Sequence, residues 1–414
     1  MSDSKIKIGI ISEKVMPYRC ALYREISKFR EIDLEIIFLD DWGLDPRFDP
    51  TMNKTYSWGR EVLEGFKSSF IKSVKASSVT YTGADKTTVE NKLGSLGSVL
   101  YYLRTFFGFW SFGVIKHVLS GKFDVVLVEN YSSISSLMGI LSAKISGARV
   151  FLRGEAALNP NLPKFILFLK KIYLGLLFRL FDGYFYSCKS NKIYYLNYGA
   201  KINELTFVPS AVDDDFFLRH LDLSKECLRA QLNIPNDSFV YLGVGRIVRR
   251  KNWTEAISAF KLACRSNRNL ILIIVGDGPE LANLQKMIGD QLSSKIIFAG
   301  FKSQAEISDF YVVADAMLQT SIYDPSPKVL NESLCFSLPS IVSDAVGTAG
   351  DVCVDGHNGY VYPIGDVNCL ASAIIKLADD EVVYSRFVSN SLELSKLWSL
   401  SVGAKNIVSR ALRG

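Results

Sequence analysis

The sequence predicts an α/β protein with two doubly wound parallel sheets, one in each half of the chain. Three observations predict this class. Short, almost entirely apolar strands alternate with helical segments, which is typical of parallel sheets covered on both faces. The alternation occurs in two separate series, and 414 residues are too many for one ordinary hydrophobic core. We therefore expect a first domain at residues 1–205 and a second at residues 206–394.

The first series begins with a strand, a loop and a helix. The strand is "IKIGIIS", the loop is "EKVMPYR", the helix is "CALYREISKF", and a second strand, "LEIIFL", follows. Residues 41–98 then break the alternation with many Gly, Ser, Thr and Asp-Pro signals, so we interpret them as an irregular insertion with partial order. The series resumes with the strands "FDVVLVEN", "ARVFLRGE" and "DGYFYSC".

The second series is more regular. Its expected elements, in order, are the strand "SFVYLGVGR", a helix at 253–265, "NLILIIVGDG", a helix at 279–291, "KIIFAGF", a helix at 304–313, "DAMLQTS", a helix at 327–336 and the strand "PSIVSD". Between the two series lies "FVPSAVDDDFFLRHLDLS", whose turn-forming and acidic residues are typical of a linker. In doubly wound units the ligand lies at the carboxyl ends of the strands.

The most apolar segment of the chain is "FILFLKKIYLGLLFRLF" at 165–181. It is too short to span a bilayer comfortably, and lysines and an arginine interrupt it. We expect a buried or half-buried helix here, in preference to a helix at a membrane surface.

Composition and charge restrict the possible partners. Apolar residues form 48% and charged residues 22% of the chain, which argues against general disorder. Residues 1–205 hold 28 Lys and Arg against 19 Asp and Glu, a net charge of +9, whereas the remainder carries −3. A basic first half suits an anionic membrane or an acidic substrate, or is a solvated surface. No dense Lys/Arg run or recognised binding motif accompanies the charge, so we expect no nucleic acid partner.

Cysteine and histidine usage indicates the compartment and bears on metal binding. Seven scattered cysteines without a Cys-x-x-Cys pair favour reduced thiols, and three isolated histidines give no metal-ligand spacing. The first residues form a polar stretch and then a short apolar strand, which is not the pattern of a signal peptide. We expect a cytoplasmic protein that binds no metal and no cofactor.

One acidic motif stands at a strand-to-helix turn in the second half. In "TSIYDPSPKVLNESL", Ser326 is a suitable N-cap and Pro327 suits the first helical position. The amides of the next two residues would be helix-terminal donors, which attract phosphate. Asp324 and Glu332 could flank the same pocket and accept hydrogen bonds from a diol. The alternative is that Glu332 pairs with Lys328 at i, i+4 while Asp324 caps a turn.

Cations and glycines end two other strands of this half. "GVGRIVRRKN" places Arg246 and Lys251 after a strand that ends at Gly245, where two cations can clamp a diphosphate. A solvated basic loop is the alternative. "VGDGP" allows a base or a phosphate to approach the backbone at Gly276 and Gly278, and Phe301 is placed to line a base site.

Together these motifs resemble the donor domain of glycosyltransferase family 4, a large family of retaining enzymes with the GT-B fold. Members have a strand ending in Gly-Arg with Lys five residues after the Arg, a "VGDGP"-type turn, a "GF" strand end, and an acid-Pro turn with Glu eight residues after the acid. The matching order and spacing cover about residues 206–365. The resemblance implies two Rossmann-like domains facing each other across a deep cleft, with acceptor bound by the first domain and donor by the second. The helix in 395–414 would pack back on the first domain.

The resemblance also implies roles for single residues. Arg246 and Lys251 would hold the donor phosphates, Glu332 the ribose hydroxyls, and Asp324 the donor sugar. The remaining donor-site residues would be Gly245, Gly276, Gly278, Phe301, Ser326, Pro327, Lys328 and Val329, the last two through backbone amides. The sugar would keep its anomeric configuration, and the nucleotide would leave without help from a metal ion.

The first domain departs from the family pattern. The loop containing Pro17, Tyr18 and Arg19 lacks the paired glycines of many members, and Asp324 replaces a commoner Glu. "FLRGEAAL" stands near the place where many members have a catalytic-region His. As a hypothesis, Arg153 and Glu155 take over part of that role on the acceptor side.

The function implied is transfer of a hexosyl group from a UDP- or GDP-sugar to a glycan or lipid-linked acceptor, in the biosynthesis of a cell-surface polysaccharide or glycoconjugate. The basic first domain could meet the inner face of the cell membrane. Two alternatives remain open, a sugar-nucleotide epimerase of GT-B shape and a binding protein without turnover. A nicotinamide oxidoreductase is disfavoured because the first βα turn lacks the glycine fingerprint.

Overall fold

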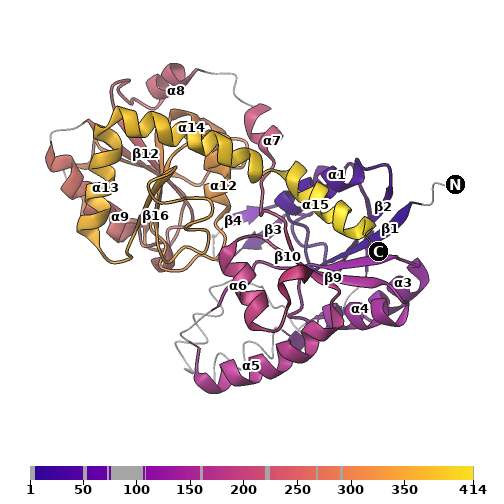
Figure 1. Cartoon of the computed structure of the whole chain (residues 1–414). Coiled ribbons are helices and arrows are strands. Elements are labelled where there is room, and N and C mark those ends of the chain that lie inside the picture. Colours follow the sequence, from indigo (N-terminus) through magenta and orange to yellow (C-terminus); the bar gives the residue numbers. More distant parts are fainter. Residues whose placement is uncertain are drawn as a thin grey trace. The chain divides into compact units, whose positions relative to one another are not determined.

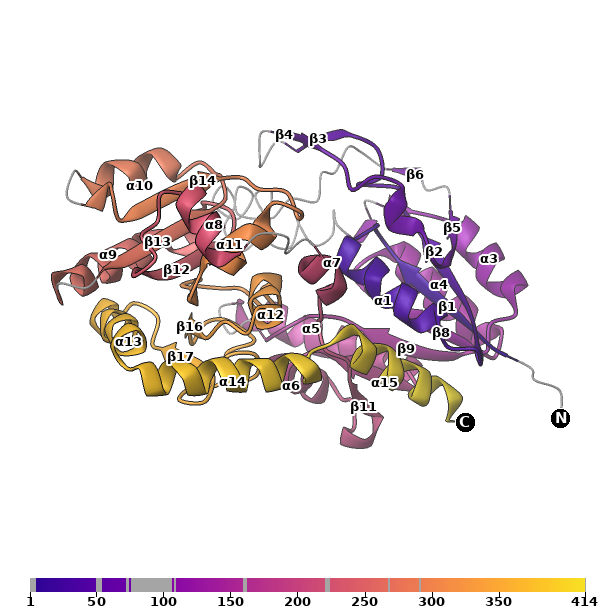
Figure 2. The same ribbon diagram turned by 90° about the horizontal axis from the view of Figure 1, so that it is seen from above.

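The computed structural model describes residues 5–49, 54–71, 74–75, 106–107, 109–158, 162–219, 224–266, 269–289 and 292–413. The chain divides into two compact units, which Figures 1 and 2 show from two directions. Unit 1 consists of Met1–Val208 and Ser401–Gly414, and unit 2 of Pro209–Leu400. The divisions thus fall after Val208 and Leu400, where the sequence suggested 205 and 394.

Unit 1 contains a seven-stranded parallel sheet with the order β11-β10-β9-β8-β1-β2-β5. Its strands are β1 (Ile6–Ser12), β2 (Ile32–Phe38), β5 (Lys67–Phe70), β8 (Val125–Val128), β9 (Arg149–Arg153), β10 (Gly183–Tyr186) and β11 (Leu205–Phe207). Its α-helices are α1 (Pro17–Ser27), α3 (Gly113–Gly121), α4 (Ile134–Ile145), α5 (Lys164–Leu177), α6 (Lys189–Asn197) and α15 (Leu400–Leu412). The apolar strands of the first series therefore form one sheet.

The segment expected as the first loop is partly helical. α1 begins at Pro17, so Tyr18 and Arg19 lie in its first turn, not on a loop. Proline suits this position because its φ is already helical and the N–H that it lacks would have no acceptor within the helix. The consequence is that Arg19 is held by a regular element rather than by a flexible connection.

The insertion at 41–98 is ordered in part. β5 adds to the edge of the main sheet beside β2, and a short antiparallel pair is formed by β3 (Arg47–Asp49) and β4 (Lys54–Tyr56). A second pair joins β6 (Val74–Lys75) to β7 (Phe109–Trp110). Residues 50–53, 72–73 and 76–98 of the predicted insertion lie outside the described residues.

Unit 2 contains a six-stranded parallel sheet with the order β14-β13-β12-β15-β16-β17. Its strands are β12 (Phe239–Val244), β13 (Leu270–Val275), β14 (Ile296–Gly300), β15 (Ala316–Gln319), β16 (Ser340–Ser343) and β17 (Gly359–Tyr362). Its helices are α7 (Asp214–Arg219), α8 (Lys225–Gln231), α9 (Trp253–Ala263), α10 (Leu281–Ile288), α11 (Ile307–Val313), α12 (Lys328–Cys335), α13 (Val367–Asp379) and α14 (Glu381–Leu397). Each strand and helix expected in the second series is present.

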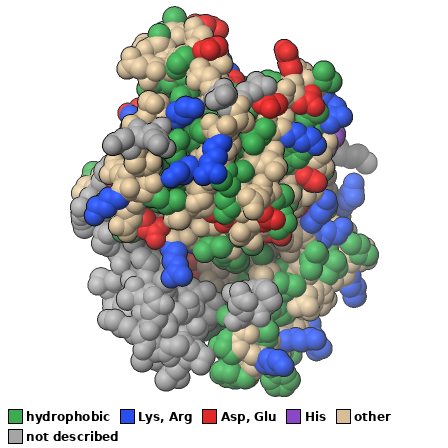
Figure 3. All heavy atoms as spheres, turned by 90° about the vertical axis from the view of Figure 1, so that its left-hand side faces the viewer, with side chains coloured by type: hydrophobic (Ala, Val, Ile, Leu, Met, Phe, Trp, Pro, Cys, Tyr) green, Lys and Arg blue, Asp and Glu red, His purple; other side chains and the backbone are tan. Residues whose placement is uncertain are grey.

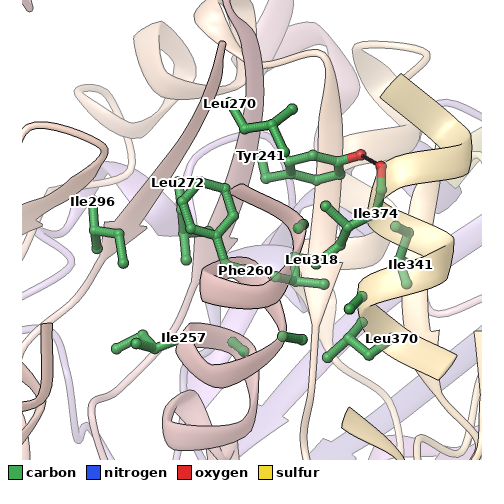
Figure 4. Packing of buried hydrophobic residues seen from close by; sticks show 14 of the residues in the cluster. Tyr241, Ile257, Phe260, Leu270, Leu272, Ile296, Leu318, Ile341, Leu370 and Ile374 are labelled. Atoms are coloured by element: carbon green, nitrogen blue, oxygen red, sulfur yellow. Dashed lines mark hydrogen bonds between the residues drawn. The ribbon is translucent and has the colours of Figure 1, made fainter. Parts of the chain in front are cut away.

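The core of unit 2 lies between this sheet and the helices α9 and α13. Figure 4 shows Ile257 and Phe260 of α9 packed near Leu272 of β13, with no side chain of the three more than marginally exposed. The buried hydroxyl of Tyr241 donates a hydrogen bond of 2.6 Å to the carbonyl oxygen of Ile374, so its polar atom has a partner inside the core. This rigid packing fixes the strand ends from which the candidate site extends.

The sequence favoured a buried or half-buried helix, and helix α5, which covers most of the apolar segment 165–181, is at most half-buried. Only Leu174 and Leu177 are buried, whereas Phe168 is 64% and Leu176 60% exposed. The pattern that predicts a buried helix counts apolar residues, but it does not report how few neighbours surround them. On the lower part of the face in Figure 3, where α5 lies in Figure 1, hydrophobic and basic side chains gather. Among the described residues, no helix is long and apolar enough to cross a membrane.

Candidate functional site

Two of the predicted donor-site residues form an ion pair in unit 2. Nζ of Lys251 lies 2.7 Å from Oδ2 of Asp324, and the two side chains are only 8% and 13% exposed. Nη1 of Arg250 lies 3.7 Å from the same oxygen. A nearly buried carboxylate is thus held by two cations at the carboxyl ends of β12 and β15.

Backbone hydrogen bonds explain why these residues meet although they are 73 positions apart. Lys251 ends a short 3₁₀ helix, Arg249–Lys251, after β12. The hydroxyl of Thr320, directly after β15, donates to the carbonyl of Lys251 at 3.0 Å, and the amide of Ile322 donates to the carbonyl of Arg250 at 2.9 Å. The parallel strands β12 and β15 are neighbours, so the loops at their carboxyl ends are necessarily adjacent.

Positive charge accumulates around Lys251. Burial, together with the charges of Arg250 and Arg246, lowers the pKa of Lys251, while Asp324 opposes that change. Arg246 therefore lies within electrostatic range of Lys251, as the motif requires. Its carbonyl oxygen accepts a hydrogen bond of 3.1 Å from Nε1 of Trp253, which fixes the loop backbone against α9.

The glycines of the "VGDGP" turn allow two strand-end loops to touch. A Cβ on Gly276, whose φ is +149°, would lie 2.0 Å from the carbonyl oxygen of Gly245. A Cβ on Gly278 would lie 2.3 Å from the carbonyl oxygen of Ile247. The structure thus gives these glycines a packing role that is independent of any ligand, and they position the loop that bears Arg246. Phe301 follows β14 beside this turn and is 44% exposed.

The amino end of α12 differs in detail from the prediction. The helix begins at Lys328, Pro327 is its N-cap rather than its first residue, and no side chain caps it. The prediction that Ser326 is the N-cap is wrong because Pro327, with ψ of 118°, still has an extended conformation. Oγ of Ser326 is buried without a hydrogen-bond partner among the described residues. The first amides of a helix, here those of Lys328 and Val329, have no acceptor within that helix.

Glu332 lies on α12 in the same electrostatic environment. Burial raises the pKa of its carboxyl, while the hydrogen bond from Tyr311 and the charges of Lys328 and Lys251 oppose this. The hydroxyl of Tyr311 donates to Oε2 of Glu332 at 2.5 Å. Lys251 is thus close enough to influence both acids of the motif, Asp324 and Glu332.

A second polar cluster lies in unit 1 at the carboxyl ends of β1, β8 and β9. Its centre is Glu129, whose side chain is 1% exposed. Oε2 of Glu129 accepts hydrogen bonds from Tyr23 at 2.6 Å, Ser12 at 2.9 Å and Arg19 at 3.0 Å. Oε1 accepts from Arg153 at 3.3 Å. The cluster contains two guanidinium groups and one carboxylate, so its net charge is positive.

The predicted acceptor-side residues lie in or beside a pocket of about 900 Å³ in unit 1. Tyr18, Arg19 and Glu155 line this pocket. Arg153 instead contacts Glu129, and Pro17 begins α1. Burial lowers the pKa of Arg19, but Glu129, Tyr18, Tyr23 and Glu155 together outweigh this effect and raise it well above its ordinary value, so the group stays charged.

Sequence reasoning missed the residues that organise the two sites. Glu129 follows the apolar strand β8 directly, and an acid at the carboxyl end of a parallel strand is a usable signal. Tyr23 and Tyr311 lie within helices, where nothing in the local pattern marks them as partners of an acid. Only the folded structure shows that these tyrosines donate hydrogen bonds to Glu129 and Glu332.

The match to a family model and the matches to curated relatives agree with each other. Residues 224–393 match the family described as "Glycosyl transferases group 1". The alpha-monoglucosyldiacylglycerol synthase of Acholeplasma laidlawii is 30% identical over 207 residues, which is 49% of this chain and 51% of the relative. The poly(glycerol-phosphate) alpha-glucosyltransferase of Bacillus subtilis is 26% identical over 46% of this chain and 28% of its own. The matches span about half, or less, of the length of these curated relatives.

Solved structures extend the similarity of fold to the whole chain. Anabaena HepE in complex with UDP aligns with a TM-score of 0.70 and 16% identity over 98% of this chain and 99% of its own. WaaG, a glycosyltransferase of lipopolysaccharide biosynthesis, aligns with a TM-score of 0.62 and 15% identity over 98% and 100%. The two Rossmann-like units therefore form a GT-B fold, and residues 224–393, somewhat less than half of the chain, match the family glycosyl transferases group 1.

Proposed function

We propose that this protein is a retaining glycosyltransferase of family 4. It transfers a sugar from a nucleoside diphosphate sugar to a glycan or lipid-linked acceptor, in glycolipid or cell-surface polysaccharide biosynthesis. The observation that carries the proposal is the meeting of Lys251 with Asp324 at 2.7 Å, within electrostatic range of Arg246 and Glu332. The relatives named above include a glycolipid synthase and a polymer glucosyltransferase, which agrees with it.

The chemistry assigned to these residues follows from charge. The bond between C1 of the sugar and the diphosphate oxygen breaks, a bond from C1 to the acceptor oxygen forms on the same face, and the acceptor's proton passes to the departing diphosphate. Negative charge grows on that diphosphate, and Arg246, Lys251 and the amides of Lys328 and Val329 would stabilise it. No metal ion takes part in this proposal.

The two acids would orient the donor. Glu332 would accept hydrogen bonds from the ribose diol, and Asp324, held by Lys251, would face the donor sugar. The buried Oγ of Ser326 at the amino end of α12 supports a phosphate-binding role there, since a phosphate oxygen would supply the partner that it lacks within the described residues. Gly245, Gly276, Gly278 and Phe301 would shape the base and phosphate side of the site.

The direct test is a thermal-shift screen of the purified protein against UDP-, GDP- and ADP-sugars, because a ligand that binds only the folded state raises its Tm. UDP is the first nucleotide to test, since it is bound in the similar HepE structure. We expect one nucleotide class to raise the Tm clearly, and release of that nucleotide to require an acceptor. Conversion of the sugar nucleotide without acceptor would favour an epimerase, and binding without transfer across a broad acceptor panel a binding protein.

We also propose that unit 1 attaches to the anionic inner face of the cell membrane through α5. Phe168, Ile172 and Leu176 form a row at i, i+4 spacing and are 64%, 48% and 60% exposed. Lys164 and Lys171 are exposed beside this row. An apolar row flanked by lysines is the pattern of a helix that lies in a membrane interface.

Vesicle co-sedimentation tests the attachment. Lys171→Glu should weaken binding to phosphatidylglycerol vesicles by about 2 kcal/mol, because each basic residue near an anionic surface contributes about 1 kcal/mol. Lys116→Glu, an exposed lysine on α3, is the matched control and should have little effect. Binding that is indifferent to salt, or equally weakened by both variants, would exclude attachment through α5.

A further inference from the structure

The pocket of unit 1 has two chemically different ends. About 900 Å³ in volume, it is within the size range that encloses small-molecule ligands. The strand ends near Glu129 contribute mainly charged and hydroxyl-bearing side chains to the lining, and α5 with its surroundings contributes mainly apolar side chains, together with Lys170. A pocket that binds only a free sugar would not require the apolar part of this lining.

The polar end is rigid and suited to hydroxyl groups. Glu129 and Arg19 line it and are fixed to each other at 3.0 Å, while Tyr23 and Ser12 hold the same carboxylate from behind. Nε of Arg19 is buried without a hydrogen-bond partner among the described residues. Glu155 also lines this end and adds a second carboxylate that can accept from a hydroxyl.

The apolar end is built from one side of α5. Phe165, Leu169 and Tyr173 recur at i, i+4, i+8 and therefore lie on one side of the helix, and all three line the pocket. Leu169 is 54% and Phe165 55% exposed, so these side chains are accessible rather than part of the core. The other apolar residues of this end are Phe106, Phe107, Leu162, Ile166 and Leu174.

We infer that this pocket binds the acceptor of the transfer, and that the acceptor is an amphiphile, a hydroxylated headgroup on a hydrocarbon chain. The headgroup occupies the end near Arg19, Glu129 and Glu155, and the chain lies along Phe165, Leu169 and Tyr173. This inference rests on the proposed function and narrows its acceptor to a lipid. A free oligosaccharide would leave the apolar end in contact with water, whereas a hydrocarbon chain would remove that surface from water.

The adjoining row of α5 favours a lipid over an apolar peptide. Phe168, Ile172 and Leu176 lie outside the pocket on the same helix, next to exposed lysines. One face of α5 can therefore rest on a bilayer while the neighbouring face receives a chain from it. A peptide ligand would need backbone hydrogen-bond partners along the apolar end, which apolar side chains do not offer.

A chain-length series tests the inference with soluble probes. Methyl, butyl, hexyl and octyl β-D-glucoside, each below its micelle concentration, are titrated against the full-length protein by calorimetry. We expect affinity to rise by about two- to fourfold for each added methylene, because burial of one methylene corresponds to at most about fourfold in affinity. The quantity to compare is the change in affinity with chain length rather than the absolute affinity, because glucose need not be the headgroup of the natural acceptor.

Two phenylalanines on α5 give a matched pair of variants. Phe165→Ala should weaken octyl glucoside binding about tenfold and flatten the chain-length slope, because Phe165 lines the pocket. Phe168→Ala removes the same side chain from the same helix, but from outside the pocket, and should leave the slope unchanged. Both residues are largely exposed, so both variants should keep the wild-type Tm.

The outcomes separate this inference from the proposed function. Equal affinity across the series, or equal effects of Phe165→Ala and Phe168→Ala, overturns the amphiphile inference even if a nucleotide sugar binds. A chain-length slope without any nucleotide-dependent rise in Tm overturns the proposed function and retains the pocket's ligand class. With both intact, Phe165→Ala should raise the KM for octyl glucoside as acceptor and leave the KM for the donor unchanged.

Discussion

At the scale of single residues, the ion pair of Lys251 and Asp324 is expected to stabilise the fold and, under the proposed function, to serve donor binding. Lys251→Met leaves a carboxylate that is 13% exposed with Arg250, at 3.7 Å, as its remaining ion-pair partner among the described residues. We expect the free energy of unfolding to fall by about 2–4 kcal/mol, since breaking a buried pair leaves an uncompensated charge. Urea denaturation measures this.

The double variant is the control for that loss. Lys251→Met with Asp324→Asn removes both charges and should recover part of the stability, while transfer activity stays lost. If the single variant is as stable as the wild type, the two side chains do not interact as the structure describes.

Glu332 supplies a pH-dependent prediction. Burial raises the pKa of its carboxyl above the ordinary value of 4.5, so the folded state binds a proton more tightly than the unfolded state. Its contribution to stability is therefore lost as pH rises above 4.5 through the folded pKa. Glu332→Gln should raise the Tm relative to wild type at pH 7 and not at pH 4, since glutamine still accepts the hydrogen bond of Tyr311.

A Tm of Glu332→Gln that exceeds the wild-type Tm at pH 4 and not at pH 7 would contradict a raised pKa of Glu332. A Tm difference that is the same at both pH values would mean that the carboxyl titrates normally. In either case Glu332→Gln should weaken nucleotide binding if the residue holds the ribose. The Tyr311→Phe variant removes only the hydrogen bond to Glu332, and it therefore separates the effect of losing that bond from the effect of losing the carboxylate.

The proximity of residues was predictable where spacing alone brings groups together. Arg246, Lys251, Asp324 and Glu332 follow strands or begin helices, and the order of parallel strands places such positions at one edge. Glu129 and its partners Tyr23 and Ser12 come from three separate elements, so their meeting depends on helix rotation and packing that spacing does not encode. The N-cap assignment of Ser326 failed for a local reason, the extended backbone at Pro327.

At the scale of elements, Glu35 joins three of them at the edge of the first sheet. Its carboxylate accepts from Lys67 at 2.9 Å and Ser69 at 2.7 Å on β5, and pairs with His117 of α3 at 2.9 Å. Burial alone would raise the pKa of Glu35, but these hydrogen bonds together outweigh burial and lower the pKa to about 2. No apolar pattern predicts this strand inside the insertion, because β5 is polar and only four residues long.

Glu35→Gln should therefore destabilise unit 1 by about 1–2 kcal/mol at pH 7. The pKa of Glu35 is depressed in the folded state, so its stabilising contribution is present above pH 4.5 and is lost as pH falls towards 2. The difference in Tm between wild type and Glu35→Gln should shrink over that range. Glu31→Gln, an exposed acid just before β2, is the control, and a pH-independent difference would be the contrary result.

Helices that pack on a sheet were easier to predict than helices at the surface. α9 and α12 have buried apolar faces that match the helical period, and both lie where the sequence suggested. α5 has more apolar residues than either of them, but most of them are accessible to solvent or line a pocket. An apolar helix face indicates a surface that packs against other apolar groups, but composition alone does not distinguish packing on protein from contact with lipid or with a ligand.

At the scale of the whole molecule, the C-terminal helix α15 belongs with unit 1 although it follows unit 2 in the chain. Ile407, Val408 and Ala411 are buried, and Nδ2 of Asn406 donates to the carbonyl of Phe207 at 2.9 Å. Arg149 of β9 also donates to the carbonyl oxygens of Ala411 and Arg413. The resemblance implied this return of the chain, which neither hydropathy nor charge indicates.

Deletion of 401–414 should therefore lower the stability of unit 1 by about 4–6 kcal/mol, since full burial of an apolar side chain contributes about 1.5–3 kcal/mol. Unit 2 should retain its nucleotide-dependent rise in melting temperature. Differential scanning calorimetry with and without UDP separates the two transitions. Loss of the nucleotide response in the deleted protein would show that donor binding depends on unit 1.

We propose that cations, helix amides and two acids of unit 2 bind one nucleoside diphosphate. Arg246→Ala should abolish the nucleotide-dependent thermal shift, whereas Arg249→Ala, an exposed arginine on the same loop, should leave it intact. The most direct measurement is a crystal structure of the protein with the nucleotide selected by that screen. We predict the distal phosphate within hydrogen-bonding distance of the amides of Lys328 and Val329 and of the Arg246 guanidinium, with the ribose on Glu332. A diphosphate bound elsewhere in the molecule, with these groups unengaged, would show that they do not form the donor site.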